Sequence, residues 1–215
     1  DIPRFLAAHE GDPGALLVGD RLAGGDRIPR ARLAAQRLAT TFLRHAAGCP
    51  LADTQCGFRL VPRAVGERVA ARAPGFAMET EFLIAALAHA VPVLPVPISA
   101  KYPEGQTSQF RPIADFFSIA SVVVAGGLIR AWAEAAGSRK APQTAARWAG
   151  CGPIRWTALA LAPALVPLTL ATAACAPKRF PIFGRTRAGV AAFARDCALA
   201  IGSLARALPS QEGAD

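Results

Sequence analysis

A long uncharged run, residues 156–176, constrains the fold of this chain more than any other part of the sequence. A helix of about 20 apolar residues is long enough to cross the hydrocarbon core of a bilayer. Trp156 stands at one end, and Lys178 and Arg179 follow the other, as anchors at a membrane interface do. Because alanine is only weakly apolar, an Ala-rich helical hairpin buried within the protein remains the alternative.

The sequence around this run predicts a helical tail behind an N-terminal domain of residues 1–112. The apolar stretch 116–129 is too short to span a bilayer comfortably, so we expect residues 113–137 to form a buried or interfacial helix. Residues 138–155 are polar and are expected to form a linker. Residues 156–215 then form the tail, with a possible transmembrane segment at 156–176.

Helices and strands alternate in the N-terminal domain, which predicts an α/β class. The apolar run 15–18 suits a strand buried on both faces of a sheet. Residues 91–98 indicate an edge or irregular strand, since prolines in a sheet are confined to edges and irregular positions. Helices are expected at residues 2–9, 30–47, 62–72 and 82–90, and a basic amphipathic helix at 187–208.

The expected helix 30–47 carries two stripes. Its apolar residues recur every four positions, which is typical of one buried helical face. Arg30, Arg37 and Arg44 recur every seven positions and form a second line. Such a helix can lie in a lipid headgroup layer, or it can be an ordinary helix that faces the core and solvates its charged side.

The most polar part of the domain is the segment 53–59, which places Asp53, Gln55 and Arg59 close together. Glu79 and Glu81 follow before an apolar helix. Asp53 is the better candidate for a catalytic or acceptor-positioning carboxylate, and Glu81 is the second. Their structural alternatives are a turn cap for Asp53 and, for both glutamates, a first helical turn that complements the helix dipole.

The charge pattern and the cysteine spacing argue against nucleic-acid binding, a metal site and a disulfide framework. The net charge is +9, but the chain has one tyrosine and no interleaving of aromatic and basic residues, which argues against a nucleic-acid stacking platform. The five cysteines show no CxxC spacing and do not pair with histidine. A metal site or a disulfide framework is therefore not expected.

Five features in order resemble a known family. They are the strand end VGDR, the Arg-striped helix, DTQCGFR, ETEFL and SQFRP, at residues 18–21, 30–47, 53–59, 79–83 and 108–112. Together they look like the C-terminal half of a family 2 glycosyltransferase of the dolichyl- or polyprenyl-phosphate sugar synthase type. Asp20, Cys56 and Gln109 stand where that family usually has Ser, Ser and His, and these departures leave the charged positions unchanged.

The resemblance implies a fold and a reaction. Residues 1–112 would be the acceptor-side part of a GT-A domain, followed by a membrane-associated helical tail at the cytoplasmic face of the membrane. The enzyme would transfer a sugar from a nucleotide-sugar to a polyprenyl or dolichyl phosphate. The family's donor-binding half, with its Asp-x-Asp motif for Mg or Mn, would precede Ile2, and without it this fragment is expected to be inactive.

The resemblance also assigns roles to the charged residues. Arg21, at a strand end, would contact a phosphate, because ligands of open α/β sheets bind at the carboxyl ends of strands. An acceptor phosphate would meet guanidinium groups, which bind phosphate in a bidentate manner. The remaining substrate-binding candidates are Arg30, Arg37, Gln55, Arg59, Ser108 and Arg111. The rival hypothesis is an inactive truncated module that acts in membrane association or partner binding.

Overall fold

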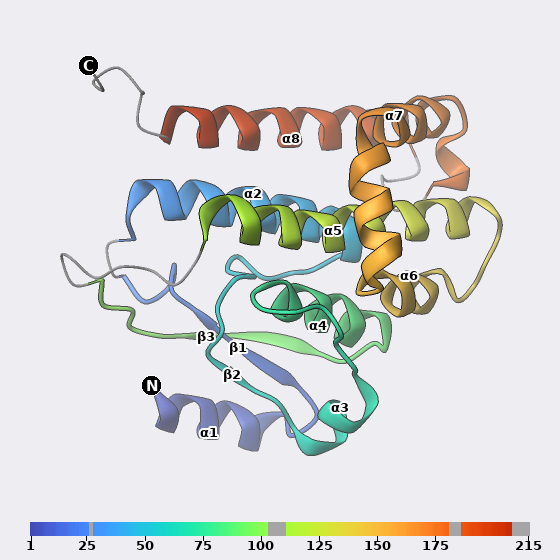
Figure 1. The fold of residues 1–215 in the computed structure, drawn as a ribbon. Helices are drawn as coiled ribbons and strands as arrows, with labels where there is room; N and C mark the ends of the chain where they lie inside the picture. The colour runs from blue at the N-terminus through green and yellow to red at the C-terminus, as the bar shows by residue number, and fades with distance from the viewer. Residues whose placement is uncertain (26–27, 103–110, 181–185, 208–215) are drawn as a thin grey trace, which may run out of the picture.

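A computed structural model describes the chain except for residues 26–27, 103–110, 181–185 and 208–215 (Figure 1). The described part confirms the predicted mixed α/β class, with helix as the larger share. In chain order its elements are α1 (Ile2–Gly11), β1 (Leu16–Asp20), α2 (Arg30–Ala47), β2 (Arg59–Leu60), α3 (Arg63–Arg68), α4 (Ala77–Ala88), β3 (Val93–Pro97), α5 (Pro112–Ala135), α6 (Ala141–Ala149), α7 (Gly152–Cys175), the 3-10 helix η1 (Pro177–Arg179) and α8 (Arg187–Ala207).

The sheet has the order β2-β1-β3, so β1 lies at its centre. β1 pairs with β3 in parallel, from Leu16 opposite Val93 to Asp20 opposite Pro97. All five residues of β1 are buried, as the apolar run predicted for a strand covered on both faces. β3 is an edge strand within the described sheet, which explains how it accommodates Pro95 and Pro97.

β2 is a short strand that the sequence did not predict. It runs antiparallel to β1 because the polar segment 53–59 folds back onto the central strand. The backbone N–H of Gly19 donates to the carbonyl of Phe58 at 2.9 Å. A side chain at position 19 would lie only 2.9 Å from Sγ of Cys56. Glycine at position 19 therefore allows the polar segment to lie directly against β1.

Helices cover the sheet unequally. Figure 1 shows α1 on one face of the sheet, α4 and the pair α2 and α5 on the other, and α8 farthest from the sheet. α2 spans the residues that the sequence predicted, and it buries Ala34, Leu38 and Leu43 on its inner side. It ends at Gly48, whose φ of 69° places it in the left-handed region that favours glycine.

Three elements differ from their prediction. α3 ends at Arg68, because Val69 adopts an extended backbone conformation. Farther on, the backbone N–H groups of Arg72 and Ala73 donate to the carboxylate of Glu81. α4 begins before Glu81, at Ala77. The expected linker 138–155 contains helix α6, whose alanines are buried against α4 and α5. Burial of one alanine face stabilises a helix that its polar residues did not indicate.

Two helices are long and apolar enough to cross a membrane, which is weak evidence for membrane association. One lies within α5, at Ala114–Ala135, and the other is α7. α5 spans Pro112–Ala135 and so agrees with the helix expected over residues 113–137. α5 is substantially covered by its neighbours, whereas only 11% of the apolar window of α7 is buried.

Candidate functional site

The centre of the polar segment is an ion pair between Arg21 and Asp53. Arg21 follows the last residue of β1, at the carboxyl end of the central strand. Its Nε and Nη2 donate to the two carboxylate oxygens of Asp53 at 2.6 and 2.9 Å. The Asp53 side chain is fully buried, whereas 22% of the Arg21 side chain is exposed. Asp53 thus holds the guanidinium in one orientation with an edge open to solvent.

The pair keeps Arg21 charged. Burial alone lowers the pKa of an arginine, but here the hydrogen bonds and charge of Asp53 outweigh it and raise the pKa of Arg21 above its ordinary value. Asp53 also accepts the backbone N–H groups of Arg21 at 3.3 Å and of Gln55 at 3.2 Å. Both of its oxygens are therefore occupied, and this geometry favours a positioning role for Asp53 over proton transfer.

Gln36 is a site residue that the sequence did not single out. Its Oε1 accepts a long hydrogen bond of 3.5 Å from Nη2 of Arg21, and its side chain comes from α2. The Gln36 Nε2 is buried and has no hydrogen-bond partner in the described structure. The available signal was its spacing of four residues from Thr40, which places both polar side chains on one face of α2.

A chain of hydroxyl and amide groups fixes the polar segment between α2 and α4. The hydroxyls of Thr40 and Thr54 lie 3.0 Å apart. The Gln55 amide donates at 3.3 Å both to Thr54 and to the Thr80 hydroxyl. Gln55, a predicted substrate-binding residue, is therefore engaged within the protein, where it connects the segment to α4.

Arg59 is bound to main-chain oxygens. It donates to the carbonyls of Cys56 at 2.9 Å, Glu79 at 2.8 Å and Thr54 at 3.3 Å. Burial lowers the pKa of Arg59, although the charge of Glu79 acts in the opposite direction. Arg59 thus holds the backbone of the polar segment and the first turn of α4 in fixed positions.

Glu81 also binds the backbone. One of its oxygens accepts the N–H groups of Arg72 and Ala73, both at 2.6 Å, and the residue is 2% exposed. Its carboxylate lies against Gly150, where a Cβ would overlap it. Glu81 therefore stabilises the chain before α4 and the contact with α6, and its catalytic role stays a prediction.

Glu79 is the carboxylate that remains available. It is half-buried, it faces Gly57, and no hydrogen bond to its carboxylate occurs within the described residues. Burial raises the pKa of Glu79 above its ordinary value, while Arg59 and Arg21 act to lower it and Asp53 adds to the rise. A carboxylate with a raised pKa is a better proton acceptor. The sequence pattern included Glu79, but its place in a first helical turn favoured a structural role.

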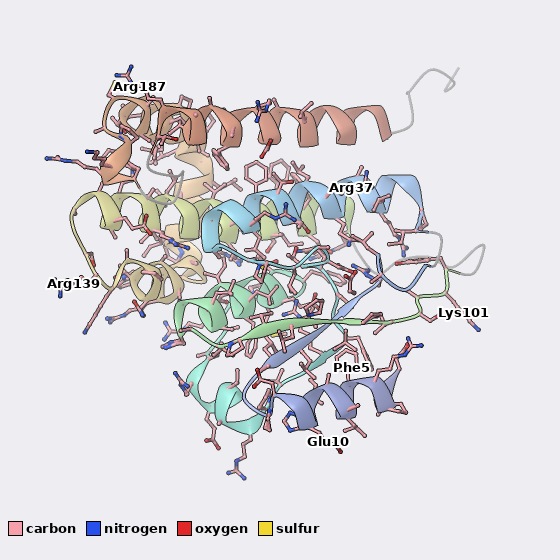
Figure 2. The ribbon with its side chains drawn as sticks, turned by 180° about the vertical axis from the view of Figure 1, so that it is seen from behind. Phe5, Glu10, Arg37, Lys101, Arg139 and Arg187 are labelled. Atoms are coloured by element: carbon pink, nitrogen blue, oxygen red, sulfur yellow. The ribbon has the colours of Figure 1, made fainter. Side chains whose placement is uncertain are left out.

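The other predicted arginines lie apart from this pair. Figure 2 shows Arg37 on α2, and its side chain is exposed. Arg111 precedes α5 and pairs at 3.0 Å with Asp115, with 77% of its side chain exposed. Ser108 and the side chain of Arg30 lie outside the described residues. In the described structure no contact joins Arg37 or Arg111 to the Arg21–Asp53 pair.

A further cation lies at the same edge of the sheet. The Arg32 guanidinium lies over the Tyr102 ring, 5.3 Å from its centre. Tyr102 follows β3, so this contact also stands at the carboxyl edge of the parallel strands. Among the described residues no group of three or more His, Cys, Asp or Glu side chains could hold a metal ion. This edge of the sheet thus carries two guanidinium groups, those of Arg21 and Arg32.

Comparison of the chain with protein-family models, curated proteins and solved structures gave no match. The resemblance to a glycosyltransferase family thus depends on the sequence motifs alone, and the structure contributes the geometry of the residues within them.

Proposed function

We propose that this protein transfers a sugar from a nucleotide-sugar to a membrane lipid phosphate, such as a polyprenyl phosphate. The observation that carries the proposal is the arrangement at the carboxyl end of β1. There Asp53 presents the charged, partly exposed guanidinium of Arg21, and the buried Nε2 of Gln36 beside it lacks an acceptor. A buried donor without a partner calls for one, and a phosphate oxygen supplies both an acceptor and a negative charge.

The chemistry needs little acid–base assistance. An oxygen of the acceptor phosphate attacks the anomeric carbon of the sugar, and the bond from that carbon to the donor diphosphate breaks. The nucleoside diphosphate leaves with the electron pair. Arg21 stabilises phosphate charge, and Glu79 accepts a proton where the acceptor is a hydroxyl or a protonated phosphate.

Binding of the nucleotide-sugar donor belongs to another part of the proposed enzyme. Mg or Mn is part of the proposal for the full-length enzyme, but the described residues include no ligand set that fits either ion. In the GT-A assignment, which is itself part of the proposal, the Asp-x-Asp ligands lie in the donor-binding half of the fold. The described residues then form the acceptor side.

The membrane supplies the acceptor. A polyprenyl phosphate is confined to the bilayer, so an enzyme that uses it works at the membrane surface. The two long apolar helices support this location. We place the protein at the cytoplasmic membrane with its catalytic part facing the cytoplasm, where nucleotide-sugars occur.

A binding experiment tests the acceptor site. A short-chain polyprenyl phosphate is titrated into the detergent-solubilised protein, with the matching alcohol as the ligand control. We expect binding of the phosphate alone, weakened at least about tenfold by Arg21→Gln or Gln36→Leu, because each removes a donor to a charged group. Arg63→Gln is the control variant, since 92% of the Arg63 side chain is exposed.

Equal affinity in Arg21→Gln and Arg63→Gln would refute the acceptor site. Membrane binding without any preference for the phosphate would instead favour the alternative, an inactive module that acts in membrane association or partner binding.

A further inference from the structure

Helix α7 presents an apolar face that no part of the described structure covers. Only Arg155, Thr169 and Ala173 of this helix are buried. Large apolar side chains stand out from it, with exposed fractions of 44% for Trp156, 50% for Leu161 and 52% for Leu168. The exposed face carries no charge from residue 156 to residue 175. A continuous apolar surface of this kind marks a contact with lipid or with a protein partner.

The helix lies along the body of the protein. Figure 1 shows α7 running across α5 from α6 toward α8. Near its C-terminal end, Thr169 accepts a hydrogen bond of 3.1 Å from the Trp132 indole, and Ala173 packs with Ala131 of α5 and with Phe180. Its N-terminal end follows Gly150, which lies against Glu81 of α4. Both ends of α7 are thus fixed to the same folded unit.

The helices on which α7 packs, α5 and α8, belong to the domain that carries the candidate site. α5 packs on α2, and Arg130 of α5 donates to the Ala46 carbonyl at 3.2 Å. α8 packs on both α2 and α7, and its Arg195 and Asp196 have side chains that are 70% and 46% exposed. If α7 spanned a bilayer, α8, which packs on it and carries these partly exposed charges, would be drawn toward the hydrocarbon, which is strongly unfavourable for charged side chains.

Cations border α7 at both ends. Arg147 of α6 precedes its first turn, Lys178 and Arg179 follow its last turn, and all three are exposed. Figure 2 shows Arg139 and Arg187 projecting from the same end of the molecule. Basic residues next to an apolar helix are attracted to anionic lipid headgroups. Pro163 and Pro167 interrupt the middle of the helix, so its shape is not that of a straight spanning segment.

We propose that α7 lies within one leaflet of an anionic bilayer, with its apolar face in the lipid and both ends on the same side. The protein then binds the membrane from one side and does not cross it. This inference rests on the membrane part of the proposed function and specifies its geometry. It differs from the spanning segment that the sequence suggested for residues 156–176.

The first test locates the two ends of α7. Single cysteines are introduced at the exposed positions Ser138 and Lys178, which lie before and after the helix, with Cys151, Cys175 and Cys197 replaced by serine. Cys49 and Cys56 stay, because they are buried. A membrane-impermeant maleimide is added to sealed vesicles of either orientation from cells that produce the full chain. We expect both cysteines to react in the same vesicle orientation, and reaction in opposite orientations would overturn the proposal.

The second test concerns the face of α7. The purified protein is sedimented with vesicles of phosphatidylcholine and phosphatidylglycerol. Leu168→Glu is compared with Leu6→Glu on α1, because both leucines are 52% exposed and Figure 1 shows α1 on the other side of the sheet from α8. We expect Leu168→Glu to weaken vesicle binding by about tenfold or more and Leu6→Glu to leave it unchanged. Equal effects of the two variants, or no binding by the unaltered protein, would overturn the proposal.

The tests of the one-leaflet geometry can fail independently of the test of the proposed function. The titration with short-chain phosphate is made in detergent and needs no bilayer. Retained phosphate binding without vesicle binding would remove the one-leaflet geometry alone. Retained vesicle binding without phosphate binding would remove the acceptor site alone.

Discussion

Replacing Asp53 with asparagine separates a positioning role from a catalytic one. The variant keeps the size of the side chain and removes its charge. In the structure, each carboxylate oxygen accepts two hydrogen bonds, one from the Arg21 guanidinium and one from a backbone N–H. Whichever oxygen becomes NH2, two of these four bonds are lost and a donor then faces two donors.

The expected loss of unfolding free energy in Asp53→Asn follows from the burial of the two side chains. Removing one partner of a buried ion pair costs about 3–5 kcal/mol, because the remaining charge is left uncompensated. Asp53 is fully buried, but 22% of the Arg21 side chain reaches solvent and recovers part of its hydration. We therefore expect Asp53→Asn to lower the free energy of unfolding by about 3 kcal/mol, at the lower end of that range.

The assay is a double-mutant cycle. Urea unfolding in mild detergent is measured for Asp53→Asn, Arg21→Gln and the double variant, and we expect a coupling free energy of about 2 kcal/mol between the two sites. The control is Glu67→Gln, since Glu67 pairs with Arg63 through side chains that are 62% and 92% exposed. Exposed pairs of this kind contribute at most about 0.5 kcal/mol.

Two results would refute this reasoning. One is a loss in Asp53→Asn no larger than that of Glu67→Gln. The other is strict additivity of Asp53→Asn and Arg21→Gln, which would mean that the two side chains do not depend on each other. In either case Asp53 does not position Arg21, and its carboxylate returns as a candidate for proton transfer.

Two further predictions concern carboxylates of α4. Because burial raises the pKa of Glu79, the folded protein retains that proton to a higher pH than the unfolded chain does. The free energy of unfolding should therefore fall as pH rises from the ordinary pKa of glutamate, about 4.3, through the raised value. Urea unfolding of Glu79→Gln over the same pH range should lack this decline. The same decline in the variant would contradict the raised pKa of Glu79. Gly150→Ala should lower stability by about 1–3 kcal/mol, since the new methyl group overlaps the buried Glu81 carboxylate. Gly11→Ala, with nothing within 4 Å of the added Cβ, is the control in the same thermal-unfolding assay, and an equal effect of the two would contradict that packing.

Sequence patterns within one segment predicted α2, β1 and β3, because the burial of each depends on its own residues. The four-residue apolar spacing gave α2 its observed span, because one face of that helix packs on the core along its whole length. The short apolar run gave β1, and the prolines indicated that β3 is an edge strand. In each case the residues of one segment determine the outcome.

Elements that depend on distant residues were not predictable in this way. Residues 72 and 73, which the sequence predicted to continue this helix or to follow it directly, instead donate their backbone N–H groups to the distant carboxylate of Glu81. α6 forms because its alanines are covered by α4 and α5, and alanine gives no strong periodic signal. β2 exists because residues 59–60 meet the central strand, a pairing that the short segment itself does not encode.

In the candidate site too, the sequence predicted the segments but not the contacts between distant residues. The motifs indicated the segments 53–59 and 79–81, and the structure brings both to α2 and the end of β1. They did not indicate that Asp53 binds Arg21, a contact across 32 positions of the chain. They favoured Glu81 as the second catalytic candidate, whereas the structure buries Glu81 against backbone N–H groups and leaves Glu79 half-buried beside Gly57. Gln36 was missed because its four-residue spacing from Thr40 is a weak signal, since two polar residues on one helical face are as typical of a solvated face.

Sugar transfer by the full-length protein tests the central claim most directly. Radiolabelled nucleotide-sugars are supplied with polyprenyl phosphate in detergent, and sugar extracted into organic solvent is measured. We predict a lipid-linked sugar with at least one donor, formed at least about tenfold more slowly by Arg21→Gln and at an unchanged rate by Arg63→Gln. The account would be contradicted if no donor yielded lipid-linked sugar, or if both variants formed it at the same rate.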